Sequence, residues 1–430
     1  MSDPYLPGHG DTAYDVLHYD LGLTYSLEGN QLHGIARLRV VAREPLTTLR
    51  LDLHHLRATK VLLPGRRVQR FDTRRGHLVI KAAGSIDEGT EFDVVVHYRG
   101  KPGIVKDRAG EAGWEELTDG ALVAGQPGGA PAWFPCNDRP ANKATYRFEV
   151  TVPSDYLAVA NGELTRRYRS SSTSTWSYEL DKPMPTYLAS LQIGRYVEVE
   201  QESPVPITGI VPSGQRSAFE KNLHDHPAIM EFFVRTFGEY PFAGYRVVFT
   251  DDDLEIPLEA GGFSTFGANF LSRDWDAQRL IAHELAHQWF GNSLTLGTWR
   301  DIWLHEGFAC YSEWLWSQEC GDDTTQERAE RHHRKLQDAP QDLVLSDPGP
   351  DDMFDDRVYK RGALTLHALR LTVGDDAFFS LLREWTAEHA HSTVDTAQFR
   401  AFAAQQTGHD LDELFTDWLD RPELPELPTT

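Results

Sequence analysis

Two histidines and two glutamates occupy positions from which they can bind and use one metal ion. His283 and His287 are four residues apart in the segment HELAH, so on a helix they project from one face and can bind an ion together. Glu306 follows His287 after eighteen residues and supplies a carboxylate as a third ligand. Two imidazoles and one carboxylate form a ligand set of catalytic zinc, which keeps a fourth position open for water. Glu284, on the same helix, can reach that water, so the spacing predicts a hydrolase with one Zn²⁺ per chain.

A chain with 18 histidines can contain an HExxH motif by chance. The residues around this motif favour a metal site instead, because they indicate two helices that would carry the ligands. Apolar residues recur with helical spacing over 280–290, and Gly291 follows as a stop signal. A second helical pattern over 303–316 presents Glu306 to the first helix. Glu313 is two turns beyond Glu306 on the same face, where it can hydrogen-bond the outer nitrogen of a zinc-bound histidine. An ordinary solvated glutamate is an equal alternative for this residue.

The segment HELAHQWFGNSLTLGTWRDIWLHEGFACYSEWLW resembles the zinc core of the aminopeptidase N family of gluzincin zinc metallopeptidases, which also contains a leukotriene-hydrolysing aminopeptidase. The resemblance extends over about residues 15–422 and covers the first two domains of the family. It implies an enzyme that removes residues from the amino termini of peptides. Full-length members continue into a large helical domain that partly covers the site. The chain stops at Thr430, so we expect a short form with a more open cleft, unless a dimer partner covers it.

The resemblance also assigns a role to Tyr359. The residues from Val358 to Gly362 match the family's Tyr-x-Lys-Gly signature, whose phenol hydrogen-bonds the developing oxyanion of the tetrahedral intermediate. Arg361 replaces the usual lysine, which keeps the charge although the two groups are not interchangeable where geometry matters. Without the resemblance, an aromatic residue packed at the start of a helix is the alternative interpretation of Tyr359.

Two further positions match residues that bind the substrate's amino group in this family. Glu259 occupies the place of the glutamate in the family's Gly-x-Met-Glu-Asn motif, but the segment here is Ile-Pro-Leu-Glu-Ala. Pro257 removes a backbone N–H that would help to align the substrate. Glu255 is the competing carboxylate. Gln126, in a loop rich in glycine and proline, stands in the place of a second amine-binding residue, and an ordinary loop residue is the alternative.

Strand and helix patterns divide the chain into two parts. Segments 36–40, 92–96 and 146–150 alternate with a period of two, and turns rich in Gly, Pro, Asp and Asn separate such segments. Helical spacing follows in the second half of the chain. We therefore predict an α+β protein of two domains. An antiparallel β-rich domain spans 1–200, and a mostly helical domain, which the resemblance identifies as a thermolysin-like zinc metallopeptidase domain, spans 201–430.

Composition narrows the classes of partner and location. The chain has 65 acidic and 42 basic residues and a net charge of −23, which disfavours nucleic acid and anionic membranes as partners. It has no run of about eighteen apolar residues and no signal-like start. Three cysteines without a CxxC pattern indicate a reducing compartment, so we predict a cytoplasmic protein. The sequence leaves open whether it is a monomer or a homodimer.

Three functions fit these residues. The first is a zinc aminopeptidase that acts on peptides with a free amino terminus. The second is a zinc hydrolase of the same fold that cleaves internal peptide bonds or a non-peptide substrate, for which the altered segment around Glu259 is the support. The third is a non-catalytic scaffold, and the joint retention of Glu284, Tyr359 and the three zinc ligands argues against it.

Overall fold

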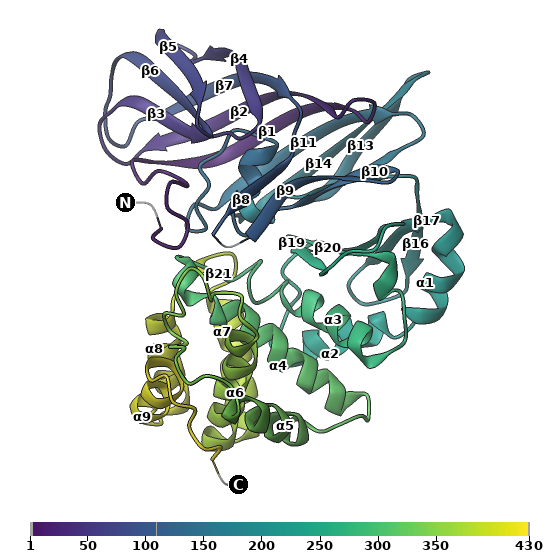
Figure 1. Ribbon diagram of the computed structural model, residues 1–430, viewed down its shortest axis with the longest axis vertical. Coiled ribbons are helices and arrows are strands. Elements are labelled where there is room, and N and C mark those ends of the chain that lie inside the picture. The colour runs from purple at the N-terminus through teal and green to yellow at the C-terminus, as the bar shows by residue number, and fades with distance from the viewer. Residues whose placement is uncertain (1–2, 109, 429–430) are drawn as a thin grey trace.

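The computed structural model describes residues 3–108 and 110–428 and consists of a strand-rich domain and a mostly helical domain (Figure 1). The two domains lie one above the other in the view of Figure 1, with the strands β19 and β20 at their junction. The predicted α+β architecture is therefore confirmed. The predicted domain boundary between residues 200 and 201 falls inside a strand, β16, which pairs with β17 of the second domain.

The first domain contains the strands β1 (Tyr14–Ser26), β2 (Gln31–Ala42), β3 (Leu46–Asp52), β4 (Leu56–Leu62), β5 (Val68–Arg74), β6 (His77–Ile86), β7 (Glu91–Gly100), β8 (Ile104–Asp107), β9 (Gly110–Leu117), β10 (Gly120–Ala124), β11 (Ala144–Pro153), β12 (Leu157–Ala160), β13 (Glu163–Arg169), β14 (Thr173–Met184) and β15 (Leu191–Gly194). They form a seven-stranded sheet in the order β13-β14-β11-β1-β2-β7-β4, a five-stranded sheet in the order β12-β15-β10-β9-β8 and a three-stranded sheet in the order β3-β6-β5.

The alternating segments of the sequence form strands, as predicted, in β2, β7 and β11. Their period of two places every second side chain in the core, as in β2, where Leu38 and Val40 are buried and Arg39 between them is exposed. One pairing departs from the predicted antiparallel arrangement, because β1 and β11 run parallel. The long stretch of chain between these two strands allows such a crossover.

The second domain contains the strands β16 (Tyr196–Gln201), β17 (Ile207–Pro212), β18 (Tyr245–Phe249), β19 (Leu258–Ala260), β20 (Phe263–Phe266), β21 (Thr295–Leu296) and β22 (Thr393–Val394), and the helices α1 (Arg216–Asn222), α2 (His226–Phe237), α3 (Trp275–Ala286), α4 (Trp303–Glu319), α5 (Thr325–Gln337), α6 (Asp356–Val373), α7 (Asp375–Glu388), α8 (Thr396–Thr407) and α9 (Asp412–Phe415). Five strands form a mixed sheet in the order β16-β17-β18-β20-β19, so β19 is an edge strand.

Helix α4 is the centre of the second domain. Its residues are buried from Trp303 to Ser317, and it packs against α3, α5 and α6. The contact with α6 is especially close, because a Cβ atom on Gly307 would meet the Cα of Gly362 at 2.8 Å. Two glycines thus bring the backbones of α4 and α6 together at the position where α4 carries Glu306.

Buried and partly buried hydrogen bonds join the two domains. The Lys143 ammonium of the first domain donates to the carbonyl oxygens of Ser293 at 2.7 Å and Ser392 at 3.1 Å. The amide of Asn161 donates to the Gly261 carbonyl at 3.0 Å, in the turn that connects β19 and β20. Across the ranges 3–108 and 110–428, no helix has the length and apolar character needed to cross a membrane.

Candidate active site

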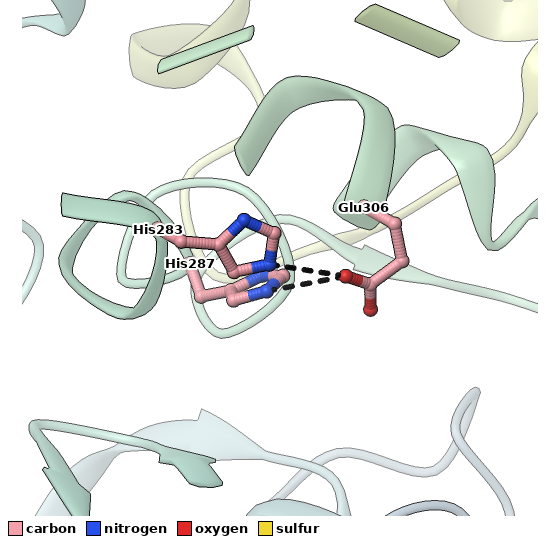
Figure 2. Close-up of side chains that lie close together, drawn as sticks. All are labelled: His283, His287 and Glu306. Carbon is pink, nitrogen blue, oxygen red and sulfur yellow. Dashed lines mark ion pairs between the residues drawn. The ribbon is translucent and has the colours of Figure 1, made fainter. Parts of the chain in front are cut away.

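His283, His287 and Glu306 converge on one buried point (Figure 2). The Nε2 atoms of both histidines lie 3.4 Å from the same atom, Oε2 of Glu306. Candidate ligand atoms of the three residues all lie within 4.8 Å of one another. The histidines come from the end of α3 and the glutamate from the first turns of α4, so the packing of these two helices creates the cluster.

The end of α3 differs slightly from the predicted helix. The regular helix stops at Ala286, and the N–H groups of Gln288 and Trp289 then bond to carbonyls three residues back, which tightens the last turn. His287 keeps a helical backbone with φ of −56° and ψ of −23°, so it still shares the face of His283. Gly291, with φ of +125°, ends this turn in a conformation that suits glycine.

Hydrogen bonds fix the outer nitrogen of each histidine. Nδ1 of His283 lies 2.8 Å from Oε1 of Glu313, and the other oxygen of Glu313 accepts from Arg279 at 3.3 Å. Nδ1 of His287 donates to the carbonyl oxygen of Phe290 at 3.0 Å. Because a carbonyl oxygen only accepts, His287 carries its proton on Nδ1, which leaves the Nε2 lone pair for a metal ion.

The cluster concentrates negative charge in a buried space. Burial and, after it, the neighbouring Glu259 carboxylate raise the pKa of Glu284 to about 8. Burial would also raise the pKa of Glu306, but the two imidazoles hold it well below its usual range. Burial alone would lower the pKa of His287, but the Glu306 carboxylate raises the pKa to about 10. A divalent cation at this point would offset the excess of carboxylates, so charge and donor type both fit a metal ion.

Glu284 and Tyr359 line the same cavity as the three candidate ligands. Glu284 is buried, and its Oε2 atom has no hydrogen-bond partner within the described part of the chain. Tyr359, in the first turn of α6, stacks on His283 with ring centroids 6.1 Å apart. Burial raises the pKa of Tyr359 well above its ordinary value, with added contributions from Glu306 and Glu259, so the hydroxyl keeps its proton.

The two candidate amine-binding residues meet in this cavity from different domains. Glu259, on the edge strand β19, and Gln126, from the loop after β10, both line it. The Nε2 atom of Gln126 is buried without a hydrogen-bond partner in the described ranges. Glu255, the competing carboxylate, is exposed and outside the lining, whereas Pro257 belongs to it.

Family models match both domains. The model of the peptidase M1 N-terminal domain matches residues 16–188, and the model of the peptidase family M1 domain matches residues 221–418. The crystal structure of a variant of an M1 zinc metallopeptidase from Deinococcus radiodurans is similar with a TM-score of 0.90 and 30% identity, over 100% of this chain and 99% of that one. The chain belongs to peptidase family M1. Another crystal structure of the Deinococcus protein holds a Tyr-Ser-Ala substrate and matches equally well, with a TM-score of 0.90.

Longer aminopeptidases match this chain at lower identity. Leucyl aminopeptidase from Saccharolobus solfataricus is 24% identical over 95% of this chain and 54% of its own length. Aminopeptidase M1 from Arabidopsis thaliana is 26% identical over 71% of this chain and 37% of its own length. The chain thus spans about half or less of the length of these relatives.

The M1 site fits the zinc ion of the family's metallopeptidases. The residues that would hold it are His283, His287 and Glu306, whose two imidazoles and one carboxylate are the ligand set of catalytic zinc. A fourth conspicuous side chain, His305, does not join them, because its Nε2 atom accepts a hydrogen bond from the Leu296 N–H at 2.9 Å.

Two residues of the M1 site escaped the sequence analysis. Gln288 donates to the Ala260 carbonyl at 3.2 Å and accepts from the Gly262 N–H at 2.9 Å, so the turn that follows α3 holds the strand that carries Glu259. Arg279 was missed although it lies one helical turn before His283, a spacing that signals a shared face. The sequence gives little indication of the role of Gln288, because this side chain binds backbone atoms, which are present at every residue.

Arg361, which stands in place of the lysine of the Tyr-x-Lys-Gly signature, does not line this cavity. Its guanidinium donates to several backbone carbonyls, including those of Trp418 at 2.9 Å and Pro422 at 2.6 Å. The arginine therefore anchors the last described segment of the chain to α6. A guanidinium offers five donors in a fixed planar fork, whereas an ammonium offers three on a single nitrogen.

Proposed function

We propose that this M1 protein is a zinc-dependent aminopeptidase that hydrolyses the first peptide bond of peptides with a free amino terminus. The supporting observation is that the Glu259 carboxylate and the predicted zinc ligands line one cavity of about 670 Å³. A carboxylate at a fixed place beside the metal site provides a partner for a substrate ammonium group. Cleavage is then counted from the amino terminus.

Glu284 would act as the general base. When bound, the zinc ion would act as a Lewis acid that polarises the scissile carbonyl and would lower the pKa of its bound water to about 7. Glu284 takes the proton of the attacking water and passes it to the leaving amine. Burial raises the pKa of Glu284, which makes its carboxylate a better proton acceptor.

Tyr359 would stabilise the oxyanion. Its hydroxyl keeps its proton at neutral pH and can donate a hydrogen bond as the carbonyl oxygen becomes negative. Loss of one such donor commonly costs about 3 kcal/mol of transition-state stabilisation. Tyr359 lies on α6 beside the close contact between α6 and α4, so its hydroxyl stays at a fixed distance from α4, the helix that carries Glu306.

Glu259 and Gln126 would bind the substrate's ammonium group, and Glu313 would act as a positioning residue. Gln126 offers its amide oxygen for this purpose, while its buried Nε2 is available to a substrate carbonyl. Glu313 orients His283 through the hydrogen bond to Nδ1. Pro257 has no backbone N–H to donate to a bound peptide. Alignment of the substrate therefore depends more on the side chains of Glu259 and Gln126.

The expected cytoplasmic location belongs to the same proposal. It is supported by the three cysteines, which are all free.

Metal removal tests the proposal. Purified protein should hydrolyse fluorogenic aminoacyl amides, lose this activity on treatment with a chelator and recover it when zinc is added back. Retention of full activity in metal-free protein would contradict a zinc-dependent reaction. The zinc hydrolase alternative would instead show zinc-dependent cleavage of amino-blocked or non-peptide substrates, and the scaffold would show no cleavage.

A further inference from the structure

The cavity continues past the predicted zinc ligands along α5, where basic side chains line it. The α5 residues of the lining are Arg328, Arg331, His332, Lys335 and Leu336. Their spacing of three and four residues places them on one face of the helix. Lys360 joins them from α6. We call Arg331, His332, Lys335 and Lys360 the basic wall.

The cavity has an acidic part and a part with an excess of basic side chains. Glu259, Glu284 and Glu306 gather at the metal site, and the basic wall occupies the α5 side. Of the other carboxylates in the lining, Asp276 and Glu313 pair with Arg279, and Asp356 pairs with Lys360. The separation occurs in a chain whose net charge is −23, so a cluster of cations stands out against the acidic molecule. A peptide has the same polarity, with an ammonium group at one end and a carboxylate at the other.

Part of the positive charge of the basic wall is not neutralised. Lys335 is exposed and has no ion pair or hydrogen bond among the residues that the structure describes. Lys360 has Asp356 at 3.8 Å, and the Glu313 carboxylate is near enough to raise the pKa of Lys360 as well, so its charge is partly balanced. Arg331 is paired with Asp323 at 2.8 Å. Burial, followed by the charges of Lys360 and Lys335, lowers the pKa of His332 to about 4, so both lysines lie near this ring.

The basic wall lies at a distance that suits a short peptide. Lys360 contacts Cys310, with Nζ 3.4 Å from Sγ, and His332 stacks on Trp314 with centroids 5.2 Å apart. These partners follow Glu306 on α4 by four and eight residues, or about 6 and 12 Å along the helix. An extended peptide covers about 3.5 Å per residue. The terminal carboxylate of a tripeptide or tetrapeptide, about 7 or 10 Å beyond the scissile carbonyl, falls in this interval.

We propose that the basic wall binds the C-terminal carboxylate of tripeptides and tetrapeptides and makes short free-acid peptides the preferred substrates. The inference rests on the proposed aminopeptidase activity. Lys335 is the residue that contributes most, because its charge has no partner in the described ranges. An interaction of this kind weakens as salt concentration rises.

The test compares Ala-Ala-Ala as the free acid with its C-terminal amide. The free acid should have a kcat/KM about tenfold higher, and the ratio should shrink in high salt. A third peptide, Ala-Ala-Asp amide, separates two sources of the carboxylate. Cleavage at the rate of Ala-Ala-Ala amide assigns the preference to the terminal group, as we expect, and a rate near that of the free acid assigns it to any carboxylate at that place.

Lys335→Gln identifies the residue. The ratio of free acid to amide should fall to near one, through a higher KM for the free acid. The matched control is Arg334→Gln, since Arg334 is exposed on the same helix, pairs only weakly with Glu330 at 3.9 Å and does not line the cavity. It should keep the wild-type ratio.

Two results overturn the inference. Equal cleavage of acid and amide by the wild type, or an unchanged ratio in Lys335→Gln, removes the carboxylate anchor and leaves the aminopeptidase proposal intact. Failure to cleave either form overturns the proposed function itself, and the inference with it.

Discussion

At the residue scale, Glu284 carries the proton transfers of the proposed mechanism. Glu284→Gln keeps the shape of the side chain and removes its basicity, so kcat should fall by about 10²- to 10⁴-fold. Zinc content, measured by elemental analysis, should stay near that of the wild type because Glu284 is not a predicted ligand. Wild-type turnover in this variant would show that another group acts as the base.

Glu313 acts through His283 rather than on the substrate. Removal of its carboxylate in Glu313→Ala should weaken zinc binding by about 10- to 100-fold, measured by competition with a chromogenic chelator. Glu319→Gln is the matched control, because Glu319 lies on the same helix and pairs at the surface with Arg235 at 2.6 Å. Equal zinc affinity in both variants would mean that Glu313 does not orient His283.

Helical spacing in the sequence pointed to part of the predicted site, whereas Tyr359, Glu259 and Gln126 were predicted from the family resemblance. His283 and His287 could be placed from a four-residue interval, and Glu313 from a seven-residue interval. Residues that act through backbone atoms, such as Gln288, leave no such pattern. The choice between Glu259 and Glu255 also needed the structure, since only the fold shows which one faces the cavity.

At the element scale, the close approach of α4 and α6 sets the geometry of the site. Gly307 and Gly362 face each other, and a Cβ atom on Gly362 would meet the Cα of Gly307 at 2.7 Å. Glu306 and Tyr359 are one and three residues from these glycines. Any separation of the helices therefore moves the oxyanion donor away from a predicted zinc ligand.

Gly362→Ala tests this arrangement. The added methyl group should force the helices apart and lower the free energy of unfolding by about 1–3 kcal/mol in urea titrations. Displacement of Tyr359 should also reduce kcat. Gly214→Ala is the control, because a Cβ there meets no atom within 4 Å. If Gly362→Ala matched the control in stability and kcat, the close packing would have no role in the site.

The elements were easier to predict from the sequence than their arrangement. Alternation located β2, β7 and β11, since each has one buried and one exposed face. The parallel pairing of β1 with β11 depends on partners far apart in the chain, which no local pattern records. The contact between α4 and α6 likewise depends on two single glycines in separate helices.

At the scale of the whole molecule, Lys143 joins the two domains at a half-buried position. Burial lowers its pKa to about 7. Between pH 7 and its ordinary pKa of about 10.4, the unfolded chain therefore binds more protons than the folded one. The free energy of unfolding should therefore rise with pH between pH 7 and about pH 10.4. Below pH 7, Lys143 is charged in the folded protein as well, and the full cost of burying that charge lowers the free energy of unfolding.

Comparison with Lys143→Met isolates this contribution. From pH 7 to pH 10, the difference in free energy of unfolding between wild type and variant should shift toward the wild type by about 1–4 kcal/mol. Lys182→Met, at an exposed lysine of the first domain, should show no such shift. A pH-independent difference for Lys143→Met would mean that the buried amine stays charged throughout.

The most direct test of the central claim compares one short peptide amide with a free and an acetylated amino terminus, in the wild type and in Glu259→Gln. The account predicts zinc-dependent cleavage of the free amine by the wild type and little cleavage of the acetylated form. In Glu259→Gln, kcat/KM for the free amine should fall by about 10- to 100-fold, because the amide oxygen of glutamine binds an ammonium group less strongly than a carboxylate does. Equal cleavage of free and acetylated forms by the wild type would contradict the aminopeptidase assignment and favour an endopeptidase.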